Sequence, residues 1–174
     1  MSDPRDRPPL RLAELLRDRD VDWVLSGSTV LTLYGADLRP NDLDVVPDLA
    51  PDNLDRLAGL LAELGAVPAF FPDWEPGLTL EQCRAWTPRP ATPANLDHLF
   101  VTRLGMLDVP PEITGTYTRL RAGATEFELA GVPVWVCDPR EVLDRIPDPP
   151  RRKDHERAAA YAAVRARLGS AGGG

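Results

Sequence analysis

The chain has 174 residues, 43% of them apolar, and a net charge of -7, which fits one folded domain with one hydrophobic core. We place that domain at residues 1–168 and expect a disordered tail at 169–174. The acidic charge disfavours extensive non-specific binding to nucleic acid, and two cysteines without a CxxC spacing exclude a disulfide framework and a zinc site. We expect both cysteines, Cys83 and Cys137, to be buried. Without a signal sequence or a long apolar span, a cytoplasmic protein with no membrane partner is expected.

The first part of the chain alternates helix and strand signals. Leucines at helical spacing mark its helices, and Gly65 stands just past the end of the clearest one. The cluster Ser26–Thr29 connects a strand to a helix, because Ser and Thr are good helix caps. The elements expected are a helix at 9–19, a strand at 22–25, a helix at 29–34, a strand at 42–46 and a helix at 51–64.

The second part begins with an irregular excursion, residues 67–95, which holds six prolines. A long segment of this kind in a small domain is often functional. The elements expected beyond it are a hairpin of 98–102 and 106–109, a helix at 111–120, a strand pair at 125–129 and 132–136, and helices at 140–145 and 154–168.

Two carboxylates stand two residues apart on the strand expected at 42–46. Asp42 and Asp44 therefore point to one side of the strand, while Leu43 and Val45 point to the other, into the core. Paired carboxylates repel each other unless a cation lies between them, and Mg²⁺ takes such ligands in phosphoryl-transfer sites. A solvated Asp-x-Asp at a strand edge is the alternative, because the motif alone is weakly specific.

A second feature lies 14 residues before Asp42. Gly27 and Ser28 connect a strand to a helix, and the free N–H groups of such a turn can bind a phosphate. An ordinary serine cap after a glycine turn is the alternative. Together, this turn and the paired carboxylates indicate a site for a phosphate and a cation more specifically than either feature does alone.

The run SGSTVLTLYGADLRPNDLDVV resembles the nucleotidyltransferase motif of the polymerase-β-like superfamily. It is most similar to the minimal nucleotidyltransferases and to the nucleotidyltransferase components of toxin–antitoxin and abortive-infection systems. The resemblance implies an α/β (α+β-type) fold, a mixed sheet flanked by helices. It further implies that Gly27 and Ser28, with Arg39 of the motif, bind the nucleotide, and that Asp42 and Asp44 bind Mg²⁺ or Mn²⁺.

The family needs a third carboxylate from a neighbouring strand, and the segment ending Leu107-Asp108-Val109 resembles the family's hairpin. We therefore assign Asp108 as the third metal ligand. A charge inside an apolar strand is costly without a partner cation, which favours the same residue. An exposed edge position is the alternative, and Glu126 or Glu128 would then be the substitutes.

The segment from Val132 to Asp154 also resembles these proteins, which often show an Arg-x-Lys-Asp sequence where the last helix begins. Relatives carry a lysine about eight residues earlier, and here that position falls near Ile146. Arg145, Arg151 or Lys153 could replace it, and we assign Lys153 to nucleotide binding. Arg151–Lys153 as a solvated basic run is the alternative.

These features predict an enzyme that transfers a nucleoside monophosphate from an NTP to an acceptor hydroxyl of an RNA end, a protein or a small molecule. The alternative is a non-catalytic partner-binding module, antitoxin-like or regulatory, that acts with a cognate toxin or antitoxin. His98 and His155 are expected to be structural, and the four tryptophans to be core or loop anchors, although Trp74 or Trp86 could stack on a base.

Overall fold

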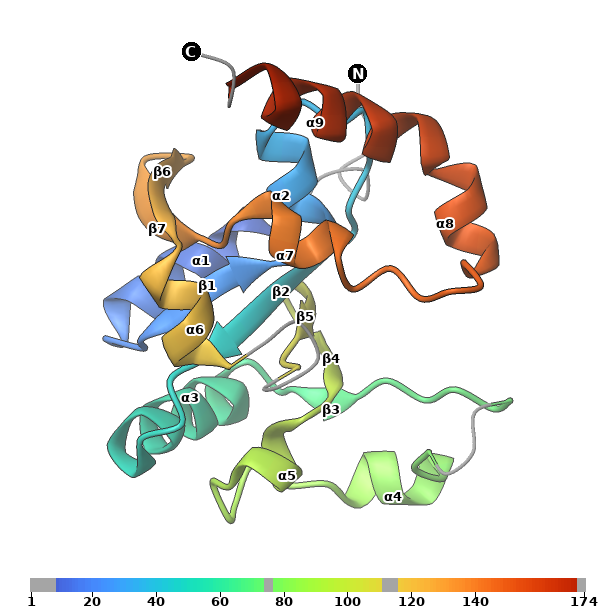
Figure 1. The fold of residues 1–174 in the computed structure, drawn as a ribbon. Coiled ribbons are helices and arrows are strands. Elements are labelled where there is room, and N and C mark those ends of the chain that lie inside the picture. Colours follow the sequence, from blue (N-terminus) through green and yellow to red (C-terminus); the bar gives the residue numbers. More distant parts are fainter. Residues whose placement is uncertain (1–8, 74–76, 111–115, 172–174) are drawn as a thin grey trace.

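A computed structural model describes residues 9–73, 77–110 and 116–171 of the chain. Within these ranges the strands are β1 (Trp23–Ser26), β2 (Asp42–Pro47), β3 (Val67–Pro68), β4 (Leu99–Thr102), β5 (Gly105–Asp108), β6 (Thr125–Leu129) and β7 (Val132–Val136). They form one mixed sheet in the order β3-β4-β5-β2-β1-β7-β6. Helices flank this sheet (Figure 1), so the expected fold class is confirmed.

Among the described residues, helices and strands alternate as far as β3 and then follow one another in short runs. They are α1 (Leu10–Asp18), α2 (Ser28–Leu33), α3 (Pro51–Glu63), α4 (Leu80–Ala85), α5 (Pro93–Leu96), α6 (Tyr117–Ala122), α7 (Pro139–Leu143), α8 (Arg152–Glu156) and α9 (Ala158–Ala171). No helix in the described part of the chain combines the length and the apolar character needed to cross a membrane.

Strand β2 lies in the middle of the sheet, where it pairs antiparallel with β1 and parallel with β5. The register sets Asp44 opposite Ser26 on one side and opposite Asp108 on the other. The hairpin β4–β5 and the pair β6–β7 are antiparallel, as expected. The parallel pairing of β2 with β5 is what brings the two acidic strands together.

The core explains why the acidic side chains of β2 face outward. Leu43 and Val45 are fully buried in the main core, where α1 and α3 contribute leucines such as Leu12 and Leu57. The alternate residues of β2 therefore point to the opposite face, as the two-residue period of a strand requires.

A smaller apolar cluster joins α2, α7 and α9. It holds Leu31, Leu143, Tyr161 and Val164, all buried. Figure 1 shows α9 lying across α2, with α8 out to the side of the sheet. Helices α7 and α9 are thus packed onto α2.

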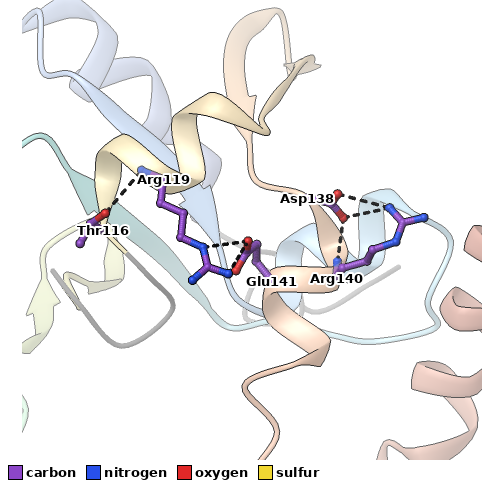
Figure 2. A network of polar contacts seen from close by, with 5 residues as sticks. All are labelled: Thr116, Arg119, Asp138, Arg140 and Glu141. Atoms are coloured by element: carbon purple, nitrogen blue, oxygen red, sulfur yellow. Dashed lines mark hydrogen bonds and ion pairs between the residues drawn. The ribbon is translucent and has the colours of Figure 1, made fainter.

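Helix α7 is held by a polar network (Figure 2). Arg119 of α6 forms an ion pair with Glu141 of α7 at 3.1 Å. Asp138 caps α7 by accepting a hydrogen bond from the Arg140 backbone N–H at 2.9 Å. Since Arg119 is well exposed, we expect this network to fix the position of α7 more than it contributes to stability.

Three segments differ from the sequence-based expectation. The irregular excursion contains β3, α4 and α5, and the side chains of Thr79 and Gln82 form a capping box at the start of α4. The helix expected at 154–168 is two helices that meet at Arg157, and α9 continues through Ala171, so 169–171 of the expected tail are helical. Of the helix expected at 111–120, residues 111–115 lie outside the described residues, as do 172–174 of the tail and Trp74.

Candidate functional site

Three carboxylates meet at one end of the central strands. Asp42, Asp44 and Asp108 each offer an oxygen atom, and these atoms lie within 4.8 Å of one another. The side chains come from β2 and β5, whose parallel register sets Asp44 beside Asp108. All three are partly buried, so each is held by its strand but still reaches the surface. The arrangement is the one expected from the sequence.

Burial raises the pKa values of the three carboxyl groups. Burial raises the pKa of Asp44 well above its usual range, and the charges of Asp42 and Asp108 raise it further. Burial also raises the pKa of Asp42, and it raises that of Asp108 to about 6. A cluster that resists ionisation in this way fits a site for hard cations, because a bound cation would offset the repulsion.

The turn between β1 and α2 packs against the same carboxylates. Gly27 has φ 73° and ψ -161°, a conformation that is essentially restricted to glycine. A Cβ atom at this position would collide with the carboxylate of Asp44, so the turn approaches the acidic cluster as closely as the backbone allows. Ser28 begins α2 directly after this turn.

A cavity of about 480 Å³ joins the turn to the carboxylates. Its lining holds Gly27, Ser28 and all three aspartates, together with the basic side chains of Arg145, Arg151, Lys153 and Arg157. Ile146, at the position where relatives carry a lysine, also lines it. The two arginines and the lysine named as substitutes from the sequence therefore lie at this cavity, and Arg157 joins them.

Asp154 fixes the segment that carries two of these cations. Its buried carboxylate accepts hydrogen bonds from the Arg151 backbone N–H at 3.0 Å, from Arg151 Nε at 2.9 Å and from the Tyr161 hydroxyl at 3.0 Å. These bonds lower the pKa of Asp154 to about 2. Lys153 is thereby held at the cavity by a residue that is not itself in the lining.

A second cavity, of about 740 Å³, adjoins the first at Asp108. It shares Asp108, Arg151 and Lys153 with the first cavity. The rest of its lining comes from the loop that follows β3, from the two residues before β4 and from the first residue of β4: Ala69, Phe71, Pro72, Asp73, Gly77, Leu78, Asp97, His98 and Leu99. Part of the excursion at 67–95 thus contributes to the site, a role that the sequence suggested only in general terms.

Other residues named from the sequence lie elsewhere. Arg39 is exposed and, among the described residues, is not one that lines either cavity. Glu126 and Glu128 are exposed on β6, at the far edge of the sheet from β5. They are therefore not needed as substitutes for Asp108.

The histidines and cysteines have structural surroundings. The His98 ring packs edge-on against Phe100 and against Trp86, and burial lowers the pKa of His98. Trp86 anchors its loop by donating a hydrogen bond to the Asn95 carbonyl at 3.0 Å. Both cysteines are buried, as expected. His155 is exposed on α8.

The fold is similar to that of a solved protein of the nucleotidyltransferase-like kind. The chain resembles the crystal structure of an antigenic nucleotidyltransferase-like protein from Paracoccidioides brasiliensis, with a TM-score of 0.54 and 17% sequence identity. The similarity covers 88% of this chain and 72% of the fungal chain. No protein-family model and no curated protein matches the chain. The two chains thus share a fold.

Proposed function

We propose that this protein is a metal-dependent nucleotidyltransferase that moves a nucleoside monophosphate from an NTP to an acceptor hydroxyl. The observation that carries the proposal is the meeting of Asp42, Asp44 and Asp108, whose oxygens lie within 4.8 Å of one another, in a cavity that also has basic side chains. Carboxylates for a cation and basic groups for a polyphosphate are the two requirements of phosphoryl transfer.

The residues divide into two groups by chemistry. Asp42, Asp44 and Asp108 would hold Mg²⁺ or Mn²⁺, since hard oxygen ligands at this separation suit either ion. When bound, such ions offset the charge on the phosphates and lower the pKa of the acceptor hydroxyl. Gly27, Ser28 and the basic side chains would bind the β- and γ-phosphates and orient the α-phosphorus toward the carboxylates.

The basic lining weakens the argument for a non-catalytic module. That alternative depended on the missing lysine near Ile146, but Arg145, Arg151, Lys153 and Arg157 supply positive charge around the same cavity. Membership of the toxin–antitoxin type, with a cognate toxin or antitoxin as partner, remains a prediction from the resemblance. The choice of NTP is also open, and a titration with each of the four would establish it.

Thermal unfolding with Mg²⁺ and each NTP tests the proposal. We expect the melting temperature to rise with ligand concentration, because a ligand that binds only the folded state stabilises it by mass action. The Asp42→Asn, Asp44→Asn double variant should lose this rise. The control is Asp37→Asn, Asp52→Asn, which removes the same charge from two exposed positions outside both cavities.

Transfer is then measured with α-labelled NTP and an extract of cellular small molecules, RNA and protein. Label should move to an acceptor with the wild-type and the control variant, and stay in the NTP with the double variant. Label transfer by the double variant at the wild-type rate would show that the three-carboxylate site is not the catalytic one.

A further inference from the structure

The two cavities adjoin at Asp108 and reach different strands of the sheet. The first cavity extends to the turn after β1, and the second is lined by Leu99 of β4 and by Ala69, which directly follows β3. Between β1 and β4 stand β2 and β5, which carry the three aspartates. Asp108 belongs to the lining of both cavities, so it forms part of the boundary between them.

The geometry of in-line displacement predicts where the nucleotide and the acceptor lie relative to the carboxylate cluster. The attacking oxygen and the leaving pyrophosphate stand on opposite sides of the α-phosphorus during phosphoryl transfer. In the proposed function the β- and γ-phosphates lie against Gly27 and Ser28, on the β1 side of the cluster. The acceptor hydroxyl must then approach from the β5 side, where the second cavity opens beside Asp108.

The size and the lining of the second cavity suit a small organic molecule. Its volume of about 740 Å³ falls within the range of about 300–1,000 Å³ that is usual for small-ligand sites. Ala69, Phe71, Leu78 and Leu99 supply apolar surface, and Phe71 is 43% exposed. An acceptor with an apolar body would bury that surface.

The charges of the lining argue against an acceptor that is a polyanion. Among the residues that the structure describes, the charged lining residues away from the edge shared with the first cavity are Asp73 and Asp97, both exposed. The cations of the lining, Arg151 and Lys153, lie at the shared edge, where the NTP phosphates would engage them. An RNA end would bring its own phosphates against two carboxylates, whereas a basic nitrogen would be attracted by them.

We infer that the second cavity is the acceptor site and that the acceptor is a small hydroxyl compound with an apolar body and a basic nitrogen. This inference depends on the proposed function for the direction of attack. The acceptor oxygen forms a bond to the α-phosphorus, the bond from that phosphorus to the bridging oxygen breaks, and pyrophosphate leaves with the electron pair. The hydroxyl proton passes to the Asp108 carboxylate at the cavity boundary.

A matched set of three alcohols tests the inference without requiring turnover. Phenylalaninol, 3-phenylpropan-1-ol and 3-phenyllactate share a phenyl body and a hydroxyl group but carry a positive, zero and negative charge. Their dissociation constants are measured by ligand-observed NMR. We expect phenylalaninol to bind the most tightly and 3-phenyllactate the least, by about five-fold at each step, as exposed charge pairs allow.

Two variants, each with a matched control, test whether the alcohols bind in the second cavity. Leu78→Trp fills the second cavity and should weaken phenylalaninol binding about ten-fold, whereas Leu80→Trp changes an exposed leucine outside the lining and should leave it unchanged. Asp73→Asn, Asp97→Asn should remove the preference for the positive charge, and the Asp37→Asn, Asp52→Asn control should keep it.

The outcomes separate this inference from the proposed function. Suppose that Mg²⁺–NTP binds but that no alcohol binds, that all three alcohols bind equally, or that Leu78→Trp leaves alcohol binding unchanged. Each of these results would overturn the acceptor site and leave the proposed nucleotidyltransferase function intact. Transfer of label to RNA or protein in place of small molecules would overturn the inference in the same way. Absence of Mg²⁺–NTP binding would refute the proposed function and with it the assignment of the cavity to an acceptor.

Discussion

Replacing Asp154 by Asn should destabilise the protein in a pH-dependent way. The Asp154 side chain is 1% exposed and accepts hydrogen bonds from Arg151 and Tyr161, which lower its pKa from 3.8 to about 2. A pKa difference of that size corresponds to about 2.5 kcal/mol of stability. The Arg151 side chain is 54% exposed, so solvent screening reduces the expected loss to about 1–2 kcal/mol.

The sign of the pH dependence follows from the direction of the pKa change. The carboxylate is favoured in the folded state, so its contribution is complete above the ordinary pKa of 3.8 and disappears as the pH falls toward about 2. Urea unfolding at a series of pH values should therefore show wild-type protein more stable than Asp154→Asn at pH 7. The difference should shrink below about pH 4.

Glu156→Gln serves as the control, because Glu156 pairs with Arg152 on the surface, where the two side chains are 65% and 95% exposed. Its effect should stay below about 0.5 kcal/mol at every pH. Equal stability of Asp154→Asn and wild-type protein at pH 7, or a difference that does not change with pH, would refute the reasoning.

Three further substitutions test the site. Gly27→Ala should cost about 1–3 kcal/mol of stability and abolish the Mg²⁺–NTP shift, since its Cβ would collide with Asp44. Asp108→Asn should abolish transfer but raise the melting temperature of the metal-free protein, because it removes charge from a repelling cluster; a lower melting temperature would contradict this. Lys153→Ala should weaken NTP binding in a titration and leave the melting temperature of the ligand-free protein within about 2 °C, since the side chain is exposed.

The acidic cluster could be predicted because it depends on local patterns. The two-residue period of a strand puts Asp42 and Asp44 on one face, and the hairpin signal puts Asp108 near the end of its own strand. The resemblance supplied the remaining step, that the two strands lie side by side. Alternation along a strand does not specify which strand pairs with it or in which register.

The cavities could not be predicted in the same way, since their linings come from segments far apart in the chain. The second cavity needs Ala69 and Leu78 beside Leu99 and Arg151, a juxtaposition that no local pattern encodes. One signal within the excursion was readable: Thr79 followed by Gln82 is a capping-box pattern, and it marks the start of α4. The many prolines around it made the whole segment look irregular.

The break between α8 and α9 was missed for a similar reason. Arg157 stands in a run that has no glycine or proline, so the sequence reads as one helix. In the structure Asp154 of α8 accepts hydrogen bonds from Arg151, which precedes α8, and from Tyr161 of α9, so it connects the two helices across the break. Helix propensity along the run does not report such a side-chain contact.

The most direct test of the central claim is a crystal structure with Mn²⁺ and a non-hydrolysable NTP analogue, with anomalous scattering recorded to locate the ions. We expect one or two ions, about 4 Å apart if two, coordinated by Asp42, Asp44 and Asp108, with the terminal phosphates against Gly27 and Ser28. Manganese bound away from these three carboxylates, or a nucleotide whose phosphates lie outside the first cavity, would contradict the account.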